Sequence, residues 1–279
     1  MNPFKQLLQH PTRGVDAHPR ASHQRVPLGT WVMSASPMVA EAIGHAGFDW
    51  AVLDMEHSPL ELPGVVAMLQ ALGATKLVPI VRLPWNDAVA CKRVLDAGAT
   101  TVMVPFVQSA DEARRAVAAM RYPPLGTRGV VGMSRATRYG TVRLDTRTAN
   151  AALALIVQLE TPQALDALEA IAAVEGVDAL FVGPADLSAT MGHGGDTKHP
   201  EVIAVLSRAA ERARAVGVPI GTLAGTPDMA TQVRAAGFDF VGLGTDLGLL
   251  VHAAQASLAA LRTPDSDQVH SLSAGTQAY

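Results

Sequence analysis

Charged and polar side chains stand at the ends of several apolar runs of this chain, where a buried strand would meet solvent. They are Asp54, Glu56, His57, Arg82, Gln158, Glu160 and Asp186. Burying such groups without partners would cost several kcal/mol each. If the fold brings them together, they therefore need mutual pairing, a bound metal or an anionic ligand.

Two of these residues, Glu160 and Asp186, follow successive apolar runs and are candidates to share one cation. Two carboxylates with no cysteine or histidine on the same runs suit a hard ion that prefers oxygen, such as Mg²⁺ or Mn²⁺. An ion pair with Arg82 would explain the same acidic residues. Spacing alone favours neither interpretation.

The segment VGPADLS (182–188) turns at Gly183 and Pro184 before a predicted helix. The free N–H groups of Ala185 and Asp186 at such a helix start can bind a carboxylate or a phosphate. The simpler interpretation is an ordinary helix N-cap provided by Asp186 or Ser188.

His57 and Arg82 have the chemistry of a proton-transfer site. A neutral imidazole is a base near pH 7, although a single histidine is more often structural. Arg82 offers a permanent positive charge to an oxyanion or a carboxylate.

The lysines discriminate between two kinds of mechanism, one through a covalent imine and one through a metal-stabilised negative charge. They are Lys5, Lys76, Lys92 and Lys198. An imine mechanism needs a desolvated lysine near the site, and the sequence places none of the four at the C-terminal end of an apolar run. A metal-stabilised enolate is therefore favoured over an imine.

The elements that must position these residues alternate along the chain. Expected strands are the apolar runs 28–33, 50–56, 77–82, 100–107, 153–160, 179–184, 218–223 and 240–246. Continuous apolar runs are typical of parallel strands covered on both faces, and helical patterns separate most of them. This order predicts a single α/β domain, a (β/α)8 TIM-type barrel with its chemistry at the C-terminal ends of the strands. An open doubly wound sheet is the alternative, but no G-x-G-x-x-G segment follows the first strand.

Composition narrows the class of protein. Hydrophobic residues make up 49% of the 279 residues, and the net charge of −3 gives no basic stripe for nucleic acid. The single cysteine, Cys91, excludes an intrachain disulfide. No apolar run approaches the roughly 20 residues that cross a bilayer. We expect a cytoplasmic protein without membrane or nucleic-acid partners.

The domain boundaries follow from the same pattern. We expect an irregular N-terminal lead-in over 1–27, the barrel over 28–262 and a disordered tail over 263–279. The arginine-rich stretch 122–150 connects a helix to a strand, so it should begin and end on the non-catalytic face. A subunit contact or a solvated loop is expected there rather than a substrate clamp.

Longer segments carry a resemblance to a known family. They are AGFDWAVLDMEHSP, VPIVRLPWND, VLDAGATTVMVPFVQSADEA, RYPPLGTRG, VQLETPQAL and EGVDALFVGPADLSATMG. From Gly29 to about Arg262 the chain resembles the metal-dependent pyruvate aldolases of the HpcH/HpaI type. That family includes 4-hydroxy-2-oxo-heptane-1,7-dioate aldolase and 2-dehydro-3-deoxy-glucarate aldolase.

The resemblance implies a metal and substrate site. Glu160 and Asp186 match the metal ligands, and the implied cofactor is a divalent cation, Mg²⁺ or Mn²⁺, with Co²⁺ as a further candidate. Gln158 matches a substrate contact, as do the amides of Ala185 and Asp186 in the turn that begins at Gly183.

The resemblance also implies catalytic roles. His57 matches the general base, and Arg82 matches the group that stabilises the enolate oxygen. The acidic partner of the histidine matches Asp96, which a barrel places on the opposite face of its own subunit. It could act only from a neighbouring subunit, in keeping with the hexamers that the family forms. Asp54, three residues before His57, is the local candidate for the same support.

The expected activity is reversible cleavage of 4-hydroxy-2-oxo acids to an aldehyde and pyruvate, or a close 2-oxo acid such as hydroxypyruvate. One alternative is a citramalyl-CoA or malyl-CoA type lyase on the same barrel. Another is a catalytically silent oligomeric binding protein. The loop MGHGGDTKHP (191–200) is expected to shape the aldehyde end of the site.

Overall fold

A closed barrel forms the centre of the computed structural model, which describes residues 1–9 and 25–262. Within these ranges eight parallel strands pair in chain order, and the last pairs with the first. They are β1 (Leu28–Val32), β2 (Trp50–Asp54), β3 (Val78–Arg82), β4 (Thr101–Val104), β5 (Ala154–Leu159), β6 (Ala179–Val182), β7 (Ile220–Ala224) and β8 (Phe240–Thr245). The predicted (β/α)8 barrel is confirmed, and the open doubly wound sheet is wrong.

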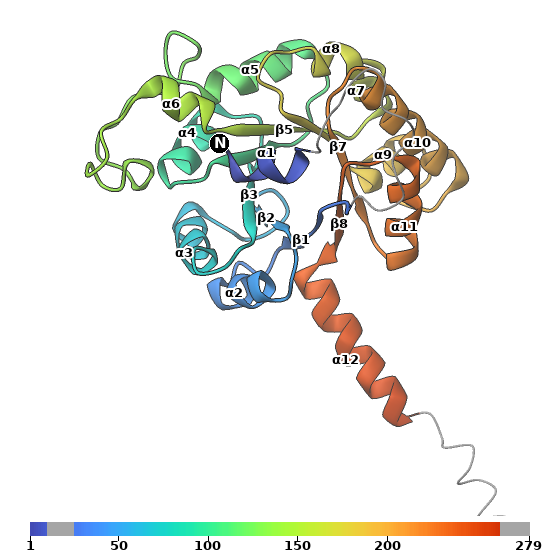
Figure 1. Cartoon of the computed structure of the whole chain (residues 1–279). Helices are drawn as coiled ribbons and strands as arrows, with labels where there is room; N and C mark the ends of the chain where they lie inside the picture. Colours follow the sequence, from blue (N-terminus) through green and yellow to red (C-terminus); the bar gives the residue numbers. More distant parts are fainter. Residues whose placement is uncertain (10–24, 263–279) are drawn as a thin grey trace, which may run out of the picture.

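Helices follow the strands and, apart from the last, lie around the barrel (Figure 1). They are α2 (Pro37–His45), α3 (Leu62–Leu72), α4 (Ala88–Asp96), α5 (Ala110–Met120), α6 (Thr146–Ala151), α7 (Pro162–Asp166), α8 (Leu168–Ala172), α9 (Pro184–Thr190), α10 (Pro200–Ala215), α11 (Pro227–Ala236) and α12 (Asp246–Arg262), with a 3-10 turn η1 (Arg135–Thr137). Side chains of Ser36, Asp87 and Ser109 accept hydrogen bonds at the starts of α2, α4 and α5, which fixes where these helices begin. Across the described ranges, no helix combines the length and the hydropathy needed to span a membrane.

Large aromatic side chains fill the interior of the barrel. Trp31, Trp50, Phe181 and Phe240 are at most 3% exposed and contact one another at centroid distances of 5.2–5.9 Å. A Cβ at Gly29 would lie 2.1 Å from the Trp50 ring, so the glycine leaves the room that this ring needs. The barrel is therefore a packed core, and polar side chains are left for its rim.

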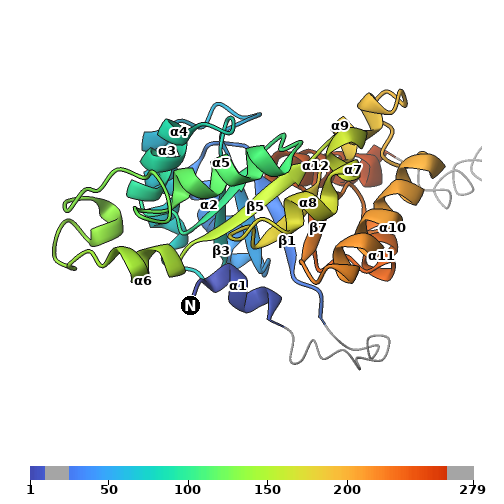
Figure 2. The same cartoon turned by 90° about the horizontal axis from the view of Figure 1, so that it is seen from above.

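The N-terminal end of the barrel is closed by α1 (Pro3–Leu8), which lies opposite α9 (Figure 2). Phe4 is fully buried and meets Phe240 edge-on at 5.2 Å. The Asn2 side chain accepts a hydrogen bond from the Phe4 N–H at 2.9 Å and donates one to the Thr100 carbonyl at 3.0 Å. Capping by Asn2 and burial of Phe4 thus anchor a short helix.

The expectation of an irregular lead-in over 1–27 is therefore wrong for residues 3–8, which are helical because a cap and a buried ring stabilise them. Residues 10–24 and the predicted tail over 263–279 lie outside the described residues.

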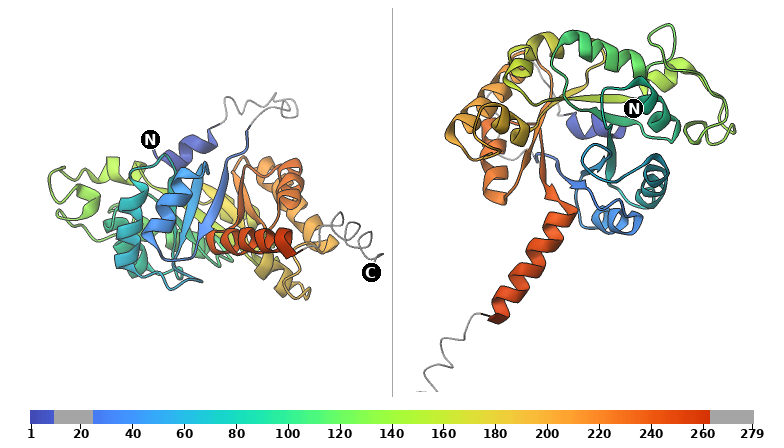
Figure 3. Two further views of the ribbon diagram at one scale, coloured as in Figure 1. Left: turned by 90° about the horizontal axis from the view of Figure 1, so that it is seen from below. Right: turned by 180° about the vertical axis from the view of Figure 1, so that it is seen from behind.

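Two parts of the chain extend beyond the barrel. Helix α12 points away from the body of the molecule (Figure 3) and exposes Leu250 and Leu261 at 66% and 86%. The connection between α5 and β5 also projects from the body, from the side of α4 and α6 (Figure 1).

We expect Phe4→Ala to lower the free energy of unfolding by about 3 kcal/mol or more, because it opens a cavity under the barrel floor. Gln6→Ala is the matched control, an exposed position on the same helix, and should change stability by less than about 0.5 kcal/mol. Urea denaturation followed by circular dichroism measures both. Equal losses in the two variants would show that α1 does not close the core.

Candidate active site

A buried ion pair lies at the C-terminal ends of β2 and β3. Asp54 and Arg82 are the last residues of these strands and are partners in the strand register. The Arg82 Nε donates to Asp54 Oδ1 at 2.8 Å, and Nη2 donates to Oδ2 at 2.6 Å. Asp54 is 0% exposed and Arg82 6%. This two-point contact fixes the plane of the guanidinium.

Glu56 lies on the other side of the Arg82 guanidinium from Asp54. Its Oε2 lies 2.9 Å from Arg82 Nη1 without making a hydrogen bond. The Glu56 N–H donates to Asp54 Oδ1 at 3.0 Å, which turns the loop after β2. Burial raises the pKa of Glu56 to about 7; Arg82 opposes this shift, and Asp54 and Asp186 add to it. No role for Glu56 followed from the sequence, although it shares the strand-face alternation of Asp54.

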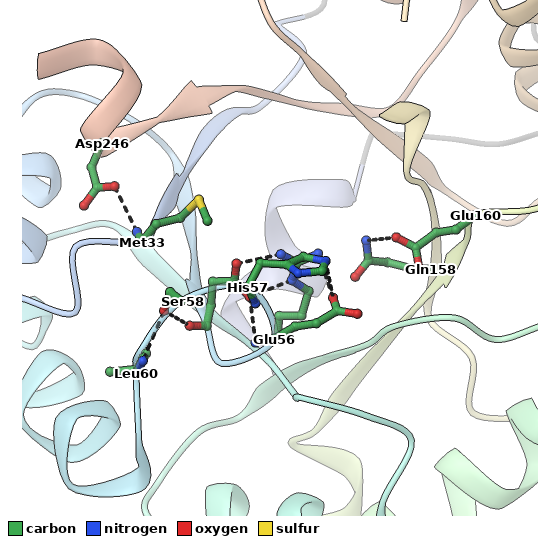
Figure 4. Close-up of polar contacts among 10 residues, drawn as sticks. Met33, Glu56, His57, Ser58, Leu60, Gln158, Glu160 and Asp246 are labelled. Atoms are coloured by element: carbon green, nitrogen blue, oxygen red, sulfur yellow. Dashed lines mark hydrogen bonds and ion pairs between the residues drawn. The ribbon is translucent and has the colours of Figure 1, made fainter. Parts of the chain in front are cut away.

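Glu160 stands directly after β5 and is 3% exposed. Its Oε2 accepts a hydrogen bond from the Phe106 N–H at 2.9 Å, and its Oε1 accepts one from Gln158 Nε2 at 3.2 Å (Figure 4). Burial and the nearby Glu56 and Asp186 raise the pKa of Glu160 to about 7, against the lowering effects of the Phe106 N–H and Arg82.

Asp186 lies in the first turn of α9 and is exposed. Gly183 is the N-cap of this helix and offers no side-chain cap, while Ser188 donates to the Asp196 carbonyl. The ordinary N-cap interpretation of Asp186 or Ser188 is therefore wrong. A Cβ at Gly183 would lie 2.6 Å from Glu160 Oε1, so glycine at this position leaves space for the carboxylate.

These side chains give the mouth of the barrel an excess of negative charge. Among the described residues there, the carboxylates of Asp54 and Glu56 contact the guanidinium of Arg82, and those of Glu160 and Asp186 lie near enough to Glu56 to raise its pKa or share its field. Arg82 pairs with Asp54 and Glu56, while the Glu160 carboxylate accepts hydrogen bonds from Phe106 and Gln158. The competing interpretation, an ion pair of Arg82 with Glu160 and Asp186, is therefore not the arrangement that the structure contains.

The donor chemistry of the mouth fits a divalent cation. Glu160 and Asp186 supply carboxylate oxygens, and the buried Gln158 Oε1 has no hydrogen-bond partner. An all-oxygen set of this kind suits Mg²⁺ or Mn²⁺. A cation would also offset the burial and the repulsion between acids that together raise the pKa of Glu56 and Glu160.

His57 stands at the rim with its side chain 59% exposed, and its Nε2 lies 3.8 Å from Glu56 Oε2 (Figure 4). Asp54 reaches only the backbone N–H of His57, at 3.4 Å, because its carboxylate binds Arg82. The acid beside the imidazole is thus Glu56, whereas the local candidate from the sequence was Asp54.

Asp96 lies elsewhere in the chain. It ends α4, and its Oδ1 accepts a hydrogen bond from Arg128 Nη2 at 2.7 Å. Arg128 is 4% exposed and lies over the Tyr122 ring at 4.4 Å. Helix α4 runs from the mouth towards the floor of the barrel, so Asp96 does not meet His57 of its own chain.

An aromatic pair borders the mouth after β3 and β4. Trp85 is 55% exposed and stacks on Phe106 at a centroid distance of 5.7 Å. Phe106 has φ of +54°, a conformation that costs a non-glycine residue energy. This turn directs the Phe106 N–H at Glu160. Phe106 was not predicted as part of the site, because a sequence does not show that a phenylalanine adopts a positive φ.

Comparison with known proteins finds a matching family and similar relatives. Residues 28–253 match the family described as HpcH/HpaI aldolase/citrate lyase. The 2-dehydro-3,6-dideoxy-6-sulfogluconate aldolase of Pseudomonas putida is 48% identical over 239 residues, which cover 86% of this chain and 94% of the relative. The hydroxypyruvate/pyruvate aldolase of Paraburkholderia phytofirmans is 45% identical over 242 residues, or 85% and 93% of the two chains.

A solved structure is also similar. The crystal structure of an HpcH/HpaI aldolase/citrate lyase family protein from Burkholderia cenocepacia J2315 superposes with a TM-score of 0.86 at 39% identity. The match covers 94% of this chain and 100% of that chain.

The raised pKa values predict a pH dependence of the metal-free protein. Folded Glu56 and Glu160 titrate at about 7 and their ordinary value is 4.5, so the folded state binds more protons than the unfolded state between these values. Stability should then fall as pH rises through this window. Calorimetry should show a lower melting midpoint near pH 7.5 than near pH 5, and added Mg²⁺ should reverse the loss near pH 7.5.

Glu160→Gln should flatten this pH slope because it removes one of the two titrating groups. Glu211→Gln, at an exposed position of α10, serves as the matched control and should keep the wild-type slope. A Glu160→Gln variant with an unchanged slope would contradict the assignment.

Proposed function

Since this chain belongs to the HpcH/HpaI aldolase/citrate lyase family, we propose that it is a divalent-metal-dependent pyruvate aldolase. It cleaves 4-hydroxy-2-oxo acids reversibly to an aldehyde and pyruvate, or a close 2-oxo acid such as hydroxypyruvate. Relatives named pyruvate aldolase and 4-hydroxy-2-oxo-heptane-1,7-dioate aldolase, 44% and 45% identical to this chain, support the substrate class.

The observation that carries the proposal is the pair Glu160 and Asp186 beside an arginine that is already paired with other acids. Both would hold the divalent cation, with Mg²⁺, Mn²⁺ or Co²⁺ as candidates. When bound, such an ion withdraws electrons from the keto oxygen of the substrate and so stabilises the negative charge of the enolate.

Arg82 stabilises the same charge from the protein side. Asp54 holds its guanidinium by two hydrogen bonds of 2.8 and 2.6 Å, so the group needs no rearrangement during the reaction. The N–H groups of the Arg82 guanidinium that do not contact Asp54 or Glu56 donate to the oxyanion that develops on the substrate.

Gln158 and the turn from Gly183 to Asp186 position the substrate. The Gln158 amide lies beside Glu160 in the mouth. The backbone amides of Ala185 and Asp186, which open α9, receive the carboxylate of the 2-oxo acid.

His57 moves the proton. Its exposed imidazole takes the proton of the C4 hydroxyl as the C3–C4 bond breaks, and then gives this proton to C3 of the enolate to form pyruvate. Aldol addition runs the same two transfers in reverse. Asp96 remains the acid that we propose to reach the imidazole from a neighbouring subunit.

A homo-oligomer, a hexamer by family resemblance, is part of the proposal. The exposed leucines of α12 support it, because apolar side chains of this kind are usually covered in an assembly. A cytoplasmic location is also proposed, supported by the single cysteine, Cys91, which is a free buried thiol.

The test of the activity is a screen of 4-hydroxy-2-oxo acids that scores pyruvate release with and without chelator. We expect release only with divalent metal. Glu160→Ala combined with Asp186→Ala should lower kcat/KM by at least about a thousandfold, and the exposed control Glu211→Ala should not. Metal-independent cleavage by the double variant would rule out the scheme.

The same assay tests the competing functions. Cleavage of citramalyl-CoA or malyl-CoA in place of the free acids would identify a coenzyme A thioester lyase. Pyruvate binding without turnover of either class would identify a silent binding protein.

His57→Ala should lower kcat for retro-aldol cleavage by about 10²–10⁴-fold while pyruvate binding is kept, because the ring acts in proton transfer. His45→Ala, at an exposed histidine of α2, is the control. Stopped-flow turnover and equilibrium titration with pyruvate measure the two quantities. Unchanged turnover would reject His57 as the base.

A further inference from the structure

A cluster of nitrogen and oxygen donors lies outside the barrel mouth, in the connection between α9 and α10. The His193 and His199 rings stack at a centroid distance of 3.6 Å and an interplanar angle of 15°. His193 Nε2 lies 2.9 Å from Glu201 Oε2. One ligand atom of each residue lies within 4.8 Å of the others.

The form of imidazole that binds metal is the neutral ring, whose unprotonated nitrogen offers a lone pair. The Glu201 carboxylate is the hydrogen-bonding partner of His193, and a cation can replace the proton between them.

The backbone is shaped to bring the two rings together. Gly194 and Gly195 have φ of +61° and +87°, a conformation that glycine adopts without strain. Pro200 opens α10, and His199 is its N-cap. His199 Nδ1 accepts from the Glu201 N–H at 3.3 Å, a long hydrogen bond that can be exchanged for a metal bond.

We propose that His193, His199 and Glu201 bind a transition-metal ion of the Zn²⁺ class. Two imidazoles and one carboxylate suit Zn²⁺, Co²⁺ or Ni²⁺, and a water completes a tetrahedral set. Mg²⁺ prefers oxygen donors and is expected to bind this site weakly. The site is separate from Glu160 and Asp186, so it stands whether or not the proposed activity is correct.

The ion would clamp the α9–α10 connection to the first turn of α10. The same connection is joined to α9 through the Ser188 hydroxyl, which donates to the Asp196 carbonyl at 3.0 Å. Because α9 carries Asp186, the clamp stabilises the element that supplies one of the residues at the barrel mouth.

The experiment is titration calorimetry of the full chain with Zn²⁺ in a large excess of Mg²⁺. Mg²⁺ occupies the oxygen donors of the mouth and leaves the imidazoles free. His193→Asn removes one ligand, and His199→Asn removes another while asparagine keeps the N-cap of α10. Each variant should weaken Zn²⁺ binding by more than about tenfold, since even an outer-shell change costs that much.

His45→Asn is the matched control and should bind Zn²⁺ like the wild type. The variants assign the site because other histidines, at positions 10, 18, 23 and 270, lie outside the described residues. Loss in His193→Asn and His199→Asn but not in His45→Asn supports the proposal. No Zn²⁺ binding in excess Mg²⁺, or equal affinity in all variants, would overturn it and leave the contacts as a helix cap and an ion pair.

A second measurement removes the dependence on Mg²⁺. In the Glu160→Gln, Asp186→Asn background, added Co²⁺ should still give visible absorption bands typical of nitrogen ligation and raise the melting midpoint by roughly 5 °C at a hundredfold excess over Kd. Both effects should disappear when His199→Asn is added. Their persistence would contradict the assignment.

Discussion

Unbalanced negative charge at the barrel mouth is the constraint on which the site depends. Asp54 and Glu56 are paired with Arg82, and Glu160 is buried beside them with a pKa of about 7. Such an arrangement is costly for a protein without a counter-charge, because desolvation and repulsion act on the same groups. A divalent cation bound to these carboxylates would offset both the desolvation and the repulsion. Arg82 can still act on the substrate, because Asp54 and Glu56 already orient its guanidinium.

The rest of the fold serves to keep these groups in place. The aromatic interior fixes the barrel, and the strand register then sets Asp54 opposite Arg82. Phe106 in its left-handed turn and Gly183 at the start of α9 shape the surroundings of Glu160, one by a hydrogen bond and the other by leaving space. The second donor cluster, at His193, differs in chemistry: it offers nitrogen, so the two sites select different classes of ion.

Strand order and the residues at strand ends were predictable, because continuous apolar runs followed by charge are a local signal. The barrel and the grouping of Arg82 with Glu160 at one mouth followed from that signal. Other features depend on contacts between distant parts of the chain and leave no such trace. Helix α1 depends on the buried contact of Phe4 with Phe240, which the sequence does not show. The same is true of the loop geometry after β2 that places Glu56, and of the positive φ that forms the turn at Phe106. The pairing of Asp96 with the buried Arg128 was equally invisible.

The most direct test of the account is anomalous diffraction from a crystal soaked with Mn²⁺ and pyruvate. The account predicts an anomalous peak between the carboxylates of Glu160 and Asp186, with pyruvate oxygens beside it and Arg82 still paired with Asp54. An absence of density at that position, or both carboxylates paired with Arg82 instead, would contradict it.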